Sequence, residues 1–316
     1  MLKRLGSQIV LKARTRPPAQ FARTLGLALL NLGNQCRIFR ILLHPRFSAL
    51  AHQYPELFYK YATGGPMAMG LPVAARASCF RHHYSYLLSA FRPEFLDQAL
   101  HRGFEVFKTH RDGTCLSVVL GLGDPYYNEG ELALDFLVAG AEIFNLSFTI
   151  VPGKMFGSRA ESIILITRIQ GVRGRQPENS LAAQELGDVS PPAFLFSVLQ
   201  GFASAFGIDE FAAVSAVNQT CYTEEFSSSF LRSYDEFLSS LGAILGADGF
   251  FRCPVPVPEK PMELVKRDKR VRAKKKRAHK RRIAEDACRV FRNQRDGRIP
   301  ASSRQPMAAR VSEVCS

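Results

Sequence analysis

Two neighbouring runs of alternating apolar and polar residues constrain the fold more than any other feature of this chain. The first run covers residues 131–138 and the second covers residues 144–150. An alternation with a period of two is typical of β-strands that bury one face and leave the other face polar. The short segment between the runs, residues 139–142, predicts a hairpin connection. The chain therefore builds at least one antiparallel pair of strands.

Further strand-like patterns occupy residues 115–122, 162–170, 209–215 and 249–255. Apolar residues at helical spacing predict helices over residues 79–90, 93–108, 193–206 and 226–241, and the third of these is apolar almost all round and so should be buried. Residues 171–189 are polar and predict a loop. The first four strands are joined too closely for crossover helices and should be antiparallel, whereas the later strands can run parallel.

The predicted fold class is therefore α+β, with a mixed, mostly antiparallel sheet flanked by helices. Four strands, a central helix, a strand, a helix and a last strand follow one another. This order resembles the plan of GNAT-like acyl-CoA N-acyltransferases. The resemblance concerns the fold alone, and fold does not give function.

The positive charge of the chain is concentrated at its two ends. The formal net charge is +14, yet residues 61–259 hold 13 Lys and Arg against 21 acidic residues. Residues 1–60 hold ten basic residues and one acid, and residues 260–282 hold 13 basic residues and two acids. A polyanion is therefore not expected to cross the centre of the sheet.

These patterns divide the chain into four parts. Residues 1–60 predict a basic, amphipathic helical region, and residues 61–112 the helical part of the main domain. Residues 113–258 form the α+β, GNAT-like core. Residues 259–316 predict a basic helix followed by a disordered tail beyond about residue 283.

No segment of the sequence has the features of a membrane span or a disulfide framework. The longest apolar run, residues 25–32, is well short of the ~18 residues that a span needs. Seven cysteines are scattered singly without a CxxC pair, which argues against a disulfide framework or a zinc site. We expect a cytoplasmic protein that can lie against the inner membrane.

Two carboxylates are candidates for acid–base chemistry. Glu131 and Asp135 leave the same face of one predicted strand. A carboxylate beside a cleft can act as general base for an amine when its pKa is tuned. The alternative is that both are solvated carboxylates on an open sheet face. Tyr234 is the third candidate: acyltransferases often use a tyrosine near this position as general acid for the leaving thiolate, and the alternative is a buried structural tyrosine.

The segment Gln170, Gly171, Arg173 and Gly174 is the candidate site for an acyl-CoA. In acyltransferases, backbone N–H groups between a strand and a helix hold the pyrophosphate of CoA. About 16 residues separate Gly174 from the next predicted helix, so a plain loop is the alternative. His82 and His83 are adjacent and point in different directions on a helix, which favours a structural role. No set of residues has the spacing of a metal site.

The run over residues 266–282 has three interpretations. It can be a solvated helix or tail, it can bind an anionic membrane surface, or it can bind nucleic acid through phosphates. Nucleic acid is the least favoured because no aromatic residues are interleaved with the cations. The residues proposed to contact a membrane or another anion are Lys274, Lys275, Lys276, Arg277, Lys280, Arg281 and Arg282.

Several short motifs are spread over residues 44–282, together with the Lys/Arg-rich run after residue 260. They are His82-His83-Tyr84, Glu129-Gly130-Glu131-Leu132, Ile169-Gln170-Gly171, Val214-Ser215 with Asn218, Ser233-Tyr234-Asp235-Glu236-Phe237 and Leu241-Gly242. In the order and spacing of these motifs the chain resembles the VirK/YbjX family of Gram-negative bacteria, whose domain is of unknown function. The chain departs from the family where relatives carry Thr-Lys and Arg-Pro-Lys, and Leu238 replaces a tryptophan. The resemblance implies a virulence-associated role in envelope integrity and in resistance to cationic antimicrobial peptides.

Three functions follow from these features. The favoured one is an envelope- or virulence-associated protein that transfers an acyl group from a small-molecule donor, acyl-CoA, to an amine. The first alternative is a non-catalytic module held at a membrane by its basic ends. The second alternative is a nucleic-acid-binding protein.

Overall fold

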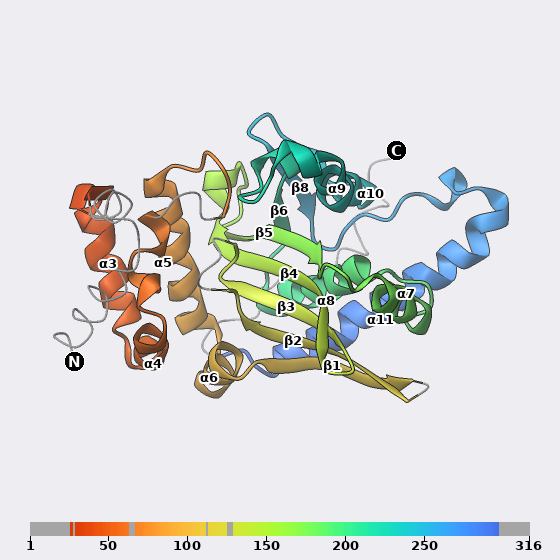
Figure 1. Ribbon diagram of the computed structural model, residues 1–316, viewed down its shortest axis with the longest axis horizontal. Coiled ribbons are helices and arrows are strands. Elements are labelled where there is room, and N and C mark those ends of the chain that lie inside the picture. Colours follow the sequence, from red (N-terminus) through yellow and green to blue (C-terminus); the bar gives the residue numbers. More distant parts are fainter. Residues whose placement is uncertain (1–25, 28, 63–66, 112, 125–128, 297–316) are drawn as a thin grey trace, which may run out of the picture.

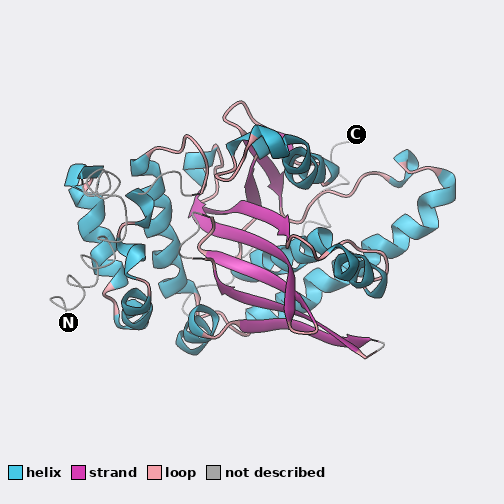
Figure 2. Cartoon of the chain, in the orientation of Figure 1, coloured by secondary structure: helices cyan, strands magenta, loops and turns pink. Residues whose placement is uncertain are grey.

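The computed structural model describes residues 26–27, 29–62, 67–111, 113–124 and 129–296. Its centre is a single eight-stranded sheet with the order β1-β2-β3-β4-β5-β6-β8-β7 (Figure 2). The strands are β1 (Phe104–Arg111), β2 (Thr114–Leu122), β3 (Leu132–Val138), β4 (Ala141–Pro152), β5 (Ser162–Gly171), β6 (Glu210–Val214), β7 (Ile244–Leu245) and β8 (Phe250–Pro254). The predicted α+β class, with a mixed sheet flanked by helices, is confirmed.

Helices lie against one face of the sheet and at the ends of its strands (Figure 1). Helices α8 and α11 lie behind the sheet in this view, while α3, α4 and α5 lie at one end of the central strands. The helices are α3 (Leu32–Leu42), α4 (Pro45–Gln53), α5 (Val73–Ala90), α6 (Pro93–His101), α7 (Gln176–Glu185), α8 (Pro191–Phe206), α9 (Ser227–Leu231), α10 (Phe237–Ser240) and α11 (Arg270–Arg292). None of the helices in the described part of the chain combines the length and the apolarity needed to cross a bilayer.

The alternation in the two central strands sorts their side chains between the two faces as predicted. β3 and β4 pair antiparallel, with Asp135 opposite Asn145 and Ala133 opposite Ser147. The apolar face packs on α8, where the ring of Phe136 lies 5.3 Å from that of Phe194. The polar side chains lie on the opposite face, which no α-helix covers along the middle of β3 and β4 (Figure 1).

Strands β5 and β6 run parallel but pair over only three residues each. Ile164 to Ile166 of β5 pair with Phe211 to Ala213 of β6, and β5 then continues to Gly171 without β6 beside it. On its other side, β5 bulges against β4: Ser147 pairs with Arg168 and Phe148 with Ile166, so that Thr167 is an extra residue. The parallel pair therefore diverges beside a bulge.

Two segments fold differently from the prediction. Residues 104–108 begin strand β1 instead of ending a helix, because Gly103 adopts a φ of 79° that ends α6 and redirects the chain. Residues 171–189, predicted as a loop, contain α7. Arg175 and Glu178 form an ion pair of 2.8 Å across its first turn, and Ala182 is buried.

The predicted helix over residues 226–241 forms, but with an irregular centre. α9 and α10 are joined by a π-helical turn over Arg232–Glu236. Such widened turns occur frequently at functional sites. This turn includes Tyr234.

The prediction of disorder beyond about residue 283 is wrong for the described residues, because α11 continues to Arg292. Its final turns bury Ile283, Ala287 and Phe291, and the ring of Phe291 lies 5.1 Å from that of Phe202 on α8. A methyl group added at Gly201 would lie 2.4 Å from the carbonyl oxygen of Ala284. The two helices therefore touch at their backbones, and α11 is part of the core. Residues 1–25 and 297–316, on which other predictions fall, lie outside the described residues.

Candidate functional site

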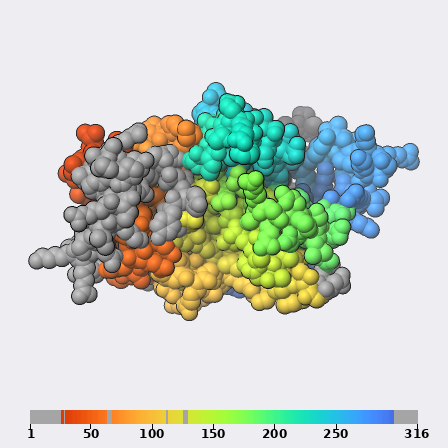
Figure 3. Space-filling view, viewed as in Figure 1, coloured from red at the N-terminus to blue at the C-terminus, as the bar shows by residue number. Residues whose placement is uncertain are grey.

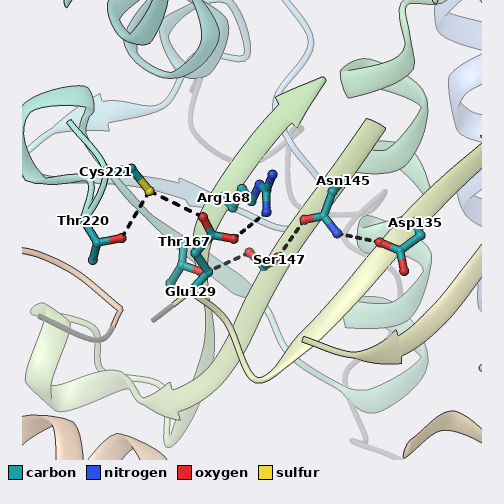
Figure 4. Close-up of polar contacts among 8 residues, drawn as sticks. All are labelled: Glu129, Asp135, Asn145, Ser147, Thr167, Arg168, Thr220 and Cys221. Carbon is teal, nitrogen blue, oxygen red and sulfur yellow. Dashed lines mark hydrogen bonds and ion pairs between the residues drawn. The ribbon is translucent and has the colours of Figure 1, made fainter. Parts of the chain in front are cut away.

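The polar face of β3, β4 and β5 carries two groups of hydrogen-bonded polar residues, one around Asn145 and one around Arg168. Figure 4 shows them crossing the sheet in order, from Asp135 on β3 through Asn145 and Ser147 on β4 to Thr167 and Arg168 on β5. In the space-filling view (Figure 3), the surface formed by these strands is framed by residues near 220–240 above and by α7 at one side. The alternation of the strands places these groups on one surface, and the framing elements give that surface walls.

An ion pair lies at the β5 side of this surface. Arg168 Nη1 is 2.7 Å from Glu129 Oε2, and the Glu129 side chain is 8% exposed. Burial alone would lower the pKa of Arg168, but Glu129 raises it, so the guanidinium stays charged. Arg168 Nε is buried without a hydrogen-bond partner in the described part of the chain. The site therefore holds the Arg168 guanidinium in a fixed position, with its Nε–H available to donate a hydrogen bond.

Cys221 adjoins the same ion pair. Its thiol donates to Glu129 Oε1 at 3.7 Å and lies 3.7 Å from the hydroxyl of Thr220 (Figure 4). Burial raises the pKa of the Cys221 thiol, and the carboxylate of Glu129 raises it further. A thiol that is kept protonated is a poor nucleophile, so this cysteine is not activated for covalent catalysis.

Asp135 has the most strongly perturbed carboxylate on the polar face. Burial raises the pKa of Asp135 to about 6, and Glu142 adds to the rise. Asn145 donates a hydrogen bond of 2.5 Å to Asp135 Oδ1 and, together with Arg168, acts in the opposite direction. Ser147 in turn donates to Asn145 Oδ1 at 2.7 Å, which fixes the orientation of the amide. A carboxyl with a pKa near neutrality can accept and return a proton at physiological pH.

Tyr234 meets β5 beyond the point where β6 ends. The backbone N–H of Ile169 donates to its hydroxyl, and Glu129, Arg168 and Cys221 act on it electrostatically. Burial raises the pKa of Tyr234 well above its ordinary value, so the phenol is protonated at neutral pH. The structure therefore brings Tyr234 next to the divergence of the parallel strands, and it can serve there only as a proton donor.

Glu131 shares a sheet face with Asp135 but lies in a closed, charged cluster. Its carboxylate forms an ion pair of 3.0 Å with Lys60, and the two side chains are 1% and 3% exposed. Tyr84 donates to Glu131 Oε2 at 2.8 Å, and Thr149 Oγ1 accepts from the Glu131 backbone N–H. This geometry suits a carboxylate that holds α5 to the end of β3. The geometry favours this structural role, and the catalytic role of Glu131 stays a prediction.

His83 belongs to the same buried region. Its Nδ1 accepts from the backbone N–H of Ile150 at 3.1 Å, and burial lowers its pKa to about 3. His82 lies 2.9 Å from Ser162 Oγ. Both histidines thus have local hydrogen-bonding roles. Among the described residues, no group of three or more His, Cys, Asp or Glu side chains is placed to hold a metal ion.

The candidate acyl-CoA segment ends β5 rather than opening a helix. Gln170 lies opposite Asn145 in the pairing of β4 with β5, so it lies beside the polar groups described above. Gly171 ends the strand, and Arg173 and Gly174 lie in the turn before α7. The buried helix α8 begins later, with Pro191 and Pro192, and proline has no N–H to offer an anion. A phosphate site at that helix start therefore lacks two of the expected donors.

The basic residues of α11 divide between two surfaces. Lys274, Lys275 and Arg282 are exposed to solvent, whereas Arg277, Lys280 and Arg281 line a groove against α8. Lys276 is half-buried. In the sequence these basic residues form one run, because the sequence does not show which face of the helix packs against α8.

Sequence reasoning missed Arg168, Asn145 and Glu129 as members of one site. Arg168 interrupts the apolar run of β5, which is a usable signal, since a cation in a buried strand needs a partner. Glu129 precedes its strand and is joined to Arg168 only by the fold.

In a comparison with protein-family models, residues 21–286 match the family described as Protein of unknown function (DUF535). This family includes VirK/YbjX, so the resemblance drawn from the motifs is confirmed. Neither the curated proteins nor the solved structures contain a match to this chain.

Proposed function

The chain belongs to the DUF535 family, and from that premise we propose that it transfers an acyl group from a thioester to an amine. The reaction converts a charged amine into a neutral amide. In the envelope or virulence setting that the VirK/YbjX resemblance implies, the acceptor is an amine-bearing envelope component or a cationic peptide. The biological consequence of the reaction is then the loss of one positive charge from the acceptor.

The divergence of β5 from β6 is the observation that carries this proposal. Beyond Ile166, no strand in the described part of the chain lies beside the edge of β5 that would face β6, and an extended ligand arm can lie along such an edge and hydrogen-bond to it. Tyr234 reaches that edge at Ile169. Arg168 and Asp135 lie on the neighbouring polar face (Figure 4). The strand order, in which β8 lies between β6 and β7, also agrees with a GNAT-like plan.

The side chains supply the proton transfers that aminolysis of a thioester needs. The amine nitrogen attacks the thioester carbonyl carbon and forms a C–N bond, while Asp135 accepts the proton that the nitrogen loses. Arg168 stabilises the oxyanion that develops. When the intermediate collapses, the C–S bond breaks and Tyr234 gives its proton to the leaving thiolate. Proton return from Asp135 through solvent restores the tyrosine.

Direct transfer is favoured over a covalent acyl-enzyme. Cys221 is the one cysteine at the described site, and its pKa is raised rather than lowered. An activated cysteine needs the opposite shift. The amine is therefore expected to attack the donor itself.

The test is an assay of thiol release from acetyl-CoA and longer acyl-CoAs, with polylysine and a polyamine as acceptors. Asp135→Asn should lower kcat by about 10²–10⁴-fold, the usual contribution of a general base. Wild-type activity should increase as the pH rises through about 6, because the carboxylate form of Asp135 is the base. Glu105→Gln, at an exposed pair with Lys108 on β1, is the matched control. Absence of amide product with every donor refutes the proposal.

A second candidate function is attachment to an anionic membrane. Leu29, Leu30 and Leu32 are 61%, 83% and 57% exposed, and Arg37 and Arg40 are exposed on the same helical region. An apolar edge beside cations is typical of interfacial helices. Leu30→Glu with Leu32→Glu should then abolish flotation with phosphatidylglycerol vesicles, and unchanged flotation removes this candidate.

A further inference from the structure

A cationic groove runs between α8 and α11, on the side of the sheet away from the polar face. It has a volume of about 820 Å³, and its walls include Ser197 and Gln200 of α8 and the segment from Pro256 to Lys260. Two acids, Glu259 and Glu285, are among its lining residues. The cations that line it are Lys260, Arg277, Lys280, Arg281, Arg289 and Arg292. The groove is therefore net positive, although the middle of the chain is acidic.

The acids present neutralise these cations only in part, since Arg289 pairs with Asp286 while the other cations have fewer acids than charges. Glu259 is shared between Arg277, at 3.8 Å, and Arg281, at 3.5 Å. Lys280 is half-buried beside them and has no ion pair in the described part of the chain. Burial lowers the pKa of Lys280, Glu259 acts in the opposite direction, and the neighbouring cations Arg277 and Lys276 lower the pKa further. An anion bound here would relieve a repulsion that the protein itself leaves in place.

The charge is spread along the groove rather than gathered at one point. From Arg277 to Arg292 the helix rises by about 22 Å, at about 1.5 Å per residue. A single carboxylate or phosphate would meet only part of this length. The groove therefore suits a ligand with two or more phosphate groups set apart from one another.

A small apolar pocket of about 10 Å³, room for about one water molecule, lies between this groove and the diverging strands. Its lining includes Ile166 of β5, Ala213 of β6 and Leu238 of α10. Phe196 and Leu241 line both the pocket and the groove. Ile166 is also the last residue of β5 that pairs with β6. The groove thus lies close to the end of the β5–β6 pairing, where the proposed chemistry takes place.

We infer that this groove binds the phosphate-bearing end of the acyl donor, a nucleotide thioester whose reactive end lies toward the end of the β5–β6 pairing. This inference rests on the proposed acyl transfer for the identity of the donor. It moves the phosphate site from residues 170–174 to the surface shared by α8 and α11. Lys280 is the central contact.

Calorimetry with the full chain tests the inference, with CoA, adenosine 3′,5′-bisphosphate and pantetheine as ligands. CoA should bind most tightly, the nucleotide should bind more weakly, and pantetheine should bind weakest. Lys280→Ala and Arg292→Ala should each weaken CoA binding at least tenfold. Lys274→Ala, on the exposed side of the same helix, should change it less than twofold, and circular dichroism checks that all three variants fold.

Equal CoA affinity in the Lys280→Ala variant and the wild type overturns the inference, as does tighter binding of pantetheine than of CoA. Phosphatidylglycerol vesicles that bind through Lys280 while CoA does not would also overturn it, because the phosphate would then belong to a lipid. Lys280-dependent CoA binding without any acyl transfer supports the groove and refutes the proposed function. If the protein transfers acyl groups but Lys280→Ala leaves the KM for the donor unchanged, the proposed function is supported and the groove is refuted as the donor site.

Discussion

Glu131 and Asp135 lie on one face of the same β-segment, yet their surroundings are opposite. Glu131 is 1% exposed and meets Lys60 and Tyr84. Asp135 is partly exposed, and its hydrogen-bond partner is the neutral amide of Asn145. The first carboxylate is stabilised as an anion by a cation, whereas the second is held by a neutral donor in a half-buried position. The difference shows that two carboxylates on one β-segment acquire different electrostatic surroundings from the partners that other elements bring.

The largest expected effect follows from breaking the closed cluster. Lys60→Met leaves the buried carboxylate of Glu131 without its cation, which should lower the free energy of unfolding by about 3–5 kcal/mol. Urea unfolding at pH 8 measures the loss.

The double variant Lys60→Met with Glu131→Leu is the control for this prediction. It removes both charges, and it should recover most of the lost stability, since an apolar replacement of a buried pair is often neutral. If the single variant is as stable as the wild type at pH 8, the cluster does not hold α5 to the sheet. The contrast drawn between a structural Glu131 and Asp135 would then be wrong.

A change of intermediate size is expected at Asp135, where the substitution should raise the free energy of unfolding instead of lowering it. Its pKa in the folded protein is about 6 against an ordinary value of 3.8, so ionisation above pH 6 disfavours the fold. Asp135→Asn removes this penalty and should raise the free energy of unfolding by about 1–3 kcal/mol at pH 8. The gain should disappear below about pH 4, where the acid is neutral in both states. A gain that persists at pH 4 would show that the pKa is not its source.

The smallest expected effect concerns the Glu129–Cys221 contact. Glu129 contributes to the raised pKa of Cys221, so Glu129→Gln should speed alkylation of this thiol by iodoacetamide about two- to fivefold at pH 7.5. Mass spectrometry of the Cys221 peptide gives the rate, with exposed Cys36 as the internal reference. A slower reaction in the variant would mean that the carboxylate activates the thiol instead.

The central sheet could be predicted from the sequence because its information is local. Alternation in β3 and β4 depends only on neighbouring residues, and it gave the strand faces, including the shared face of Glu131 and Asp135. Strand β1 was not predicted because Glu105 and Lys108 resemble the solvated face of a helix. This segment is a strand because it pairs with β2, and that pairing is a tertiary interaction. The last turns of α11 carried a usable signal, the spacing of Ile283, Ala287 and Phe291.

The candidate site was predictable only in part for the same reason. Tyr234 and Asp135 were identified from their positions on predicted elements. Their relation depends on Arg168, which interacts with both, and no local pattern reports a contact between β5 and a distant helix. The environment of Glu131 depends on Lys60, from a segment 71 positions earlier in the chain. Burial and partnership, which set each pKa, arise only from packing.

The packing of α11 on α8 has a consequence for the way this protein is made. α8 is synthesised well before α11, and the backbone contact at Gly201 needs the later helix. The end of α11 is also tied to the end of α5, where the Arg92 N–H donates to the Gln294 carbonyl and the Asp296 N–H donates to that of Ala90. During translation, at about 5–20 residues per second, the growing chain exposes the apolar side of α8 until this last helix emerges. Chaperones that recognise apolar surface therefore have a defined target on the nascent chain, and it is covered once α11 has emerged and packed on α8.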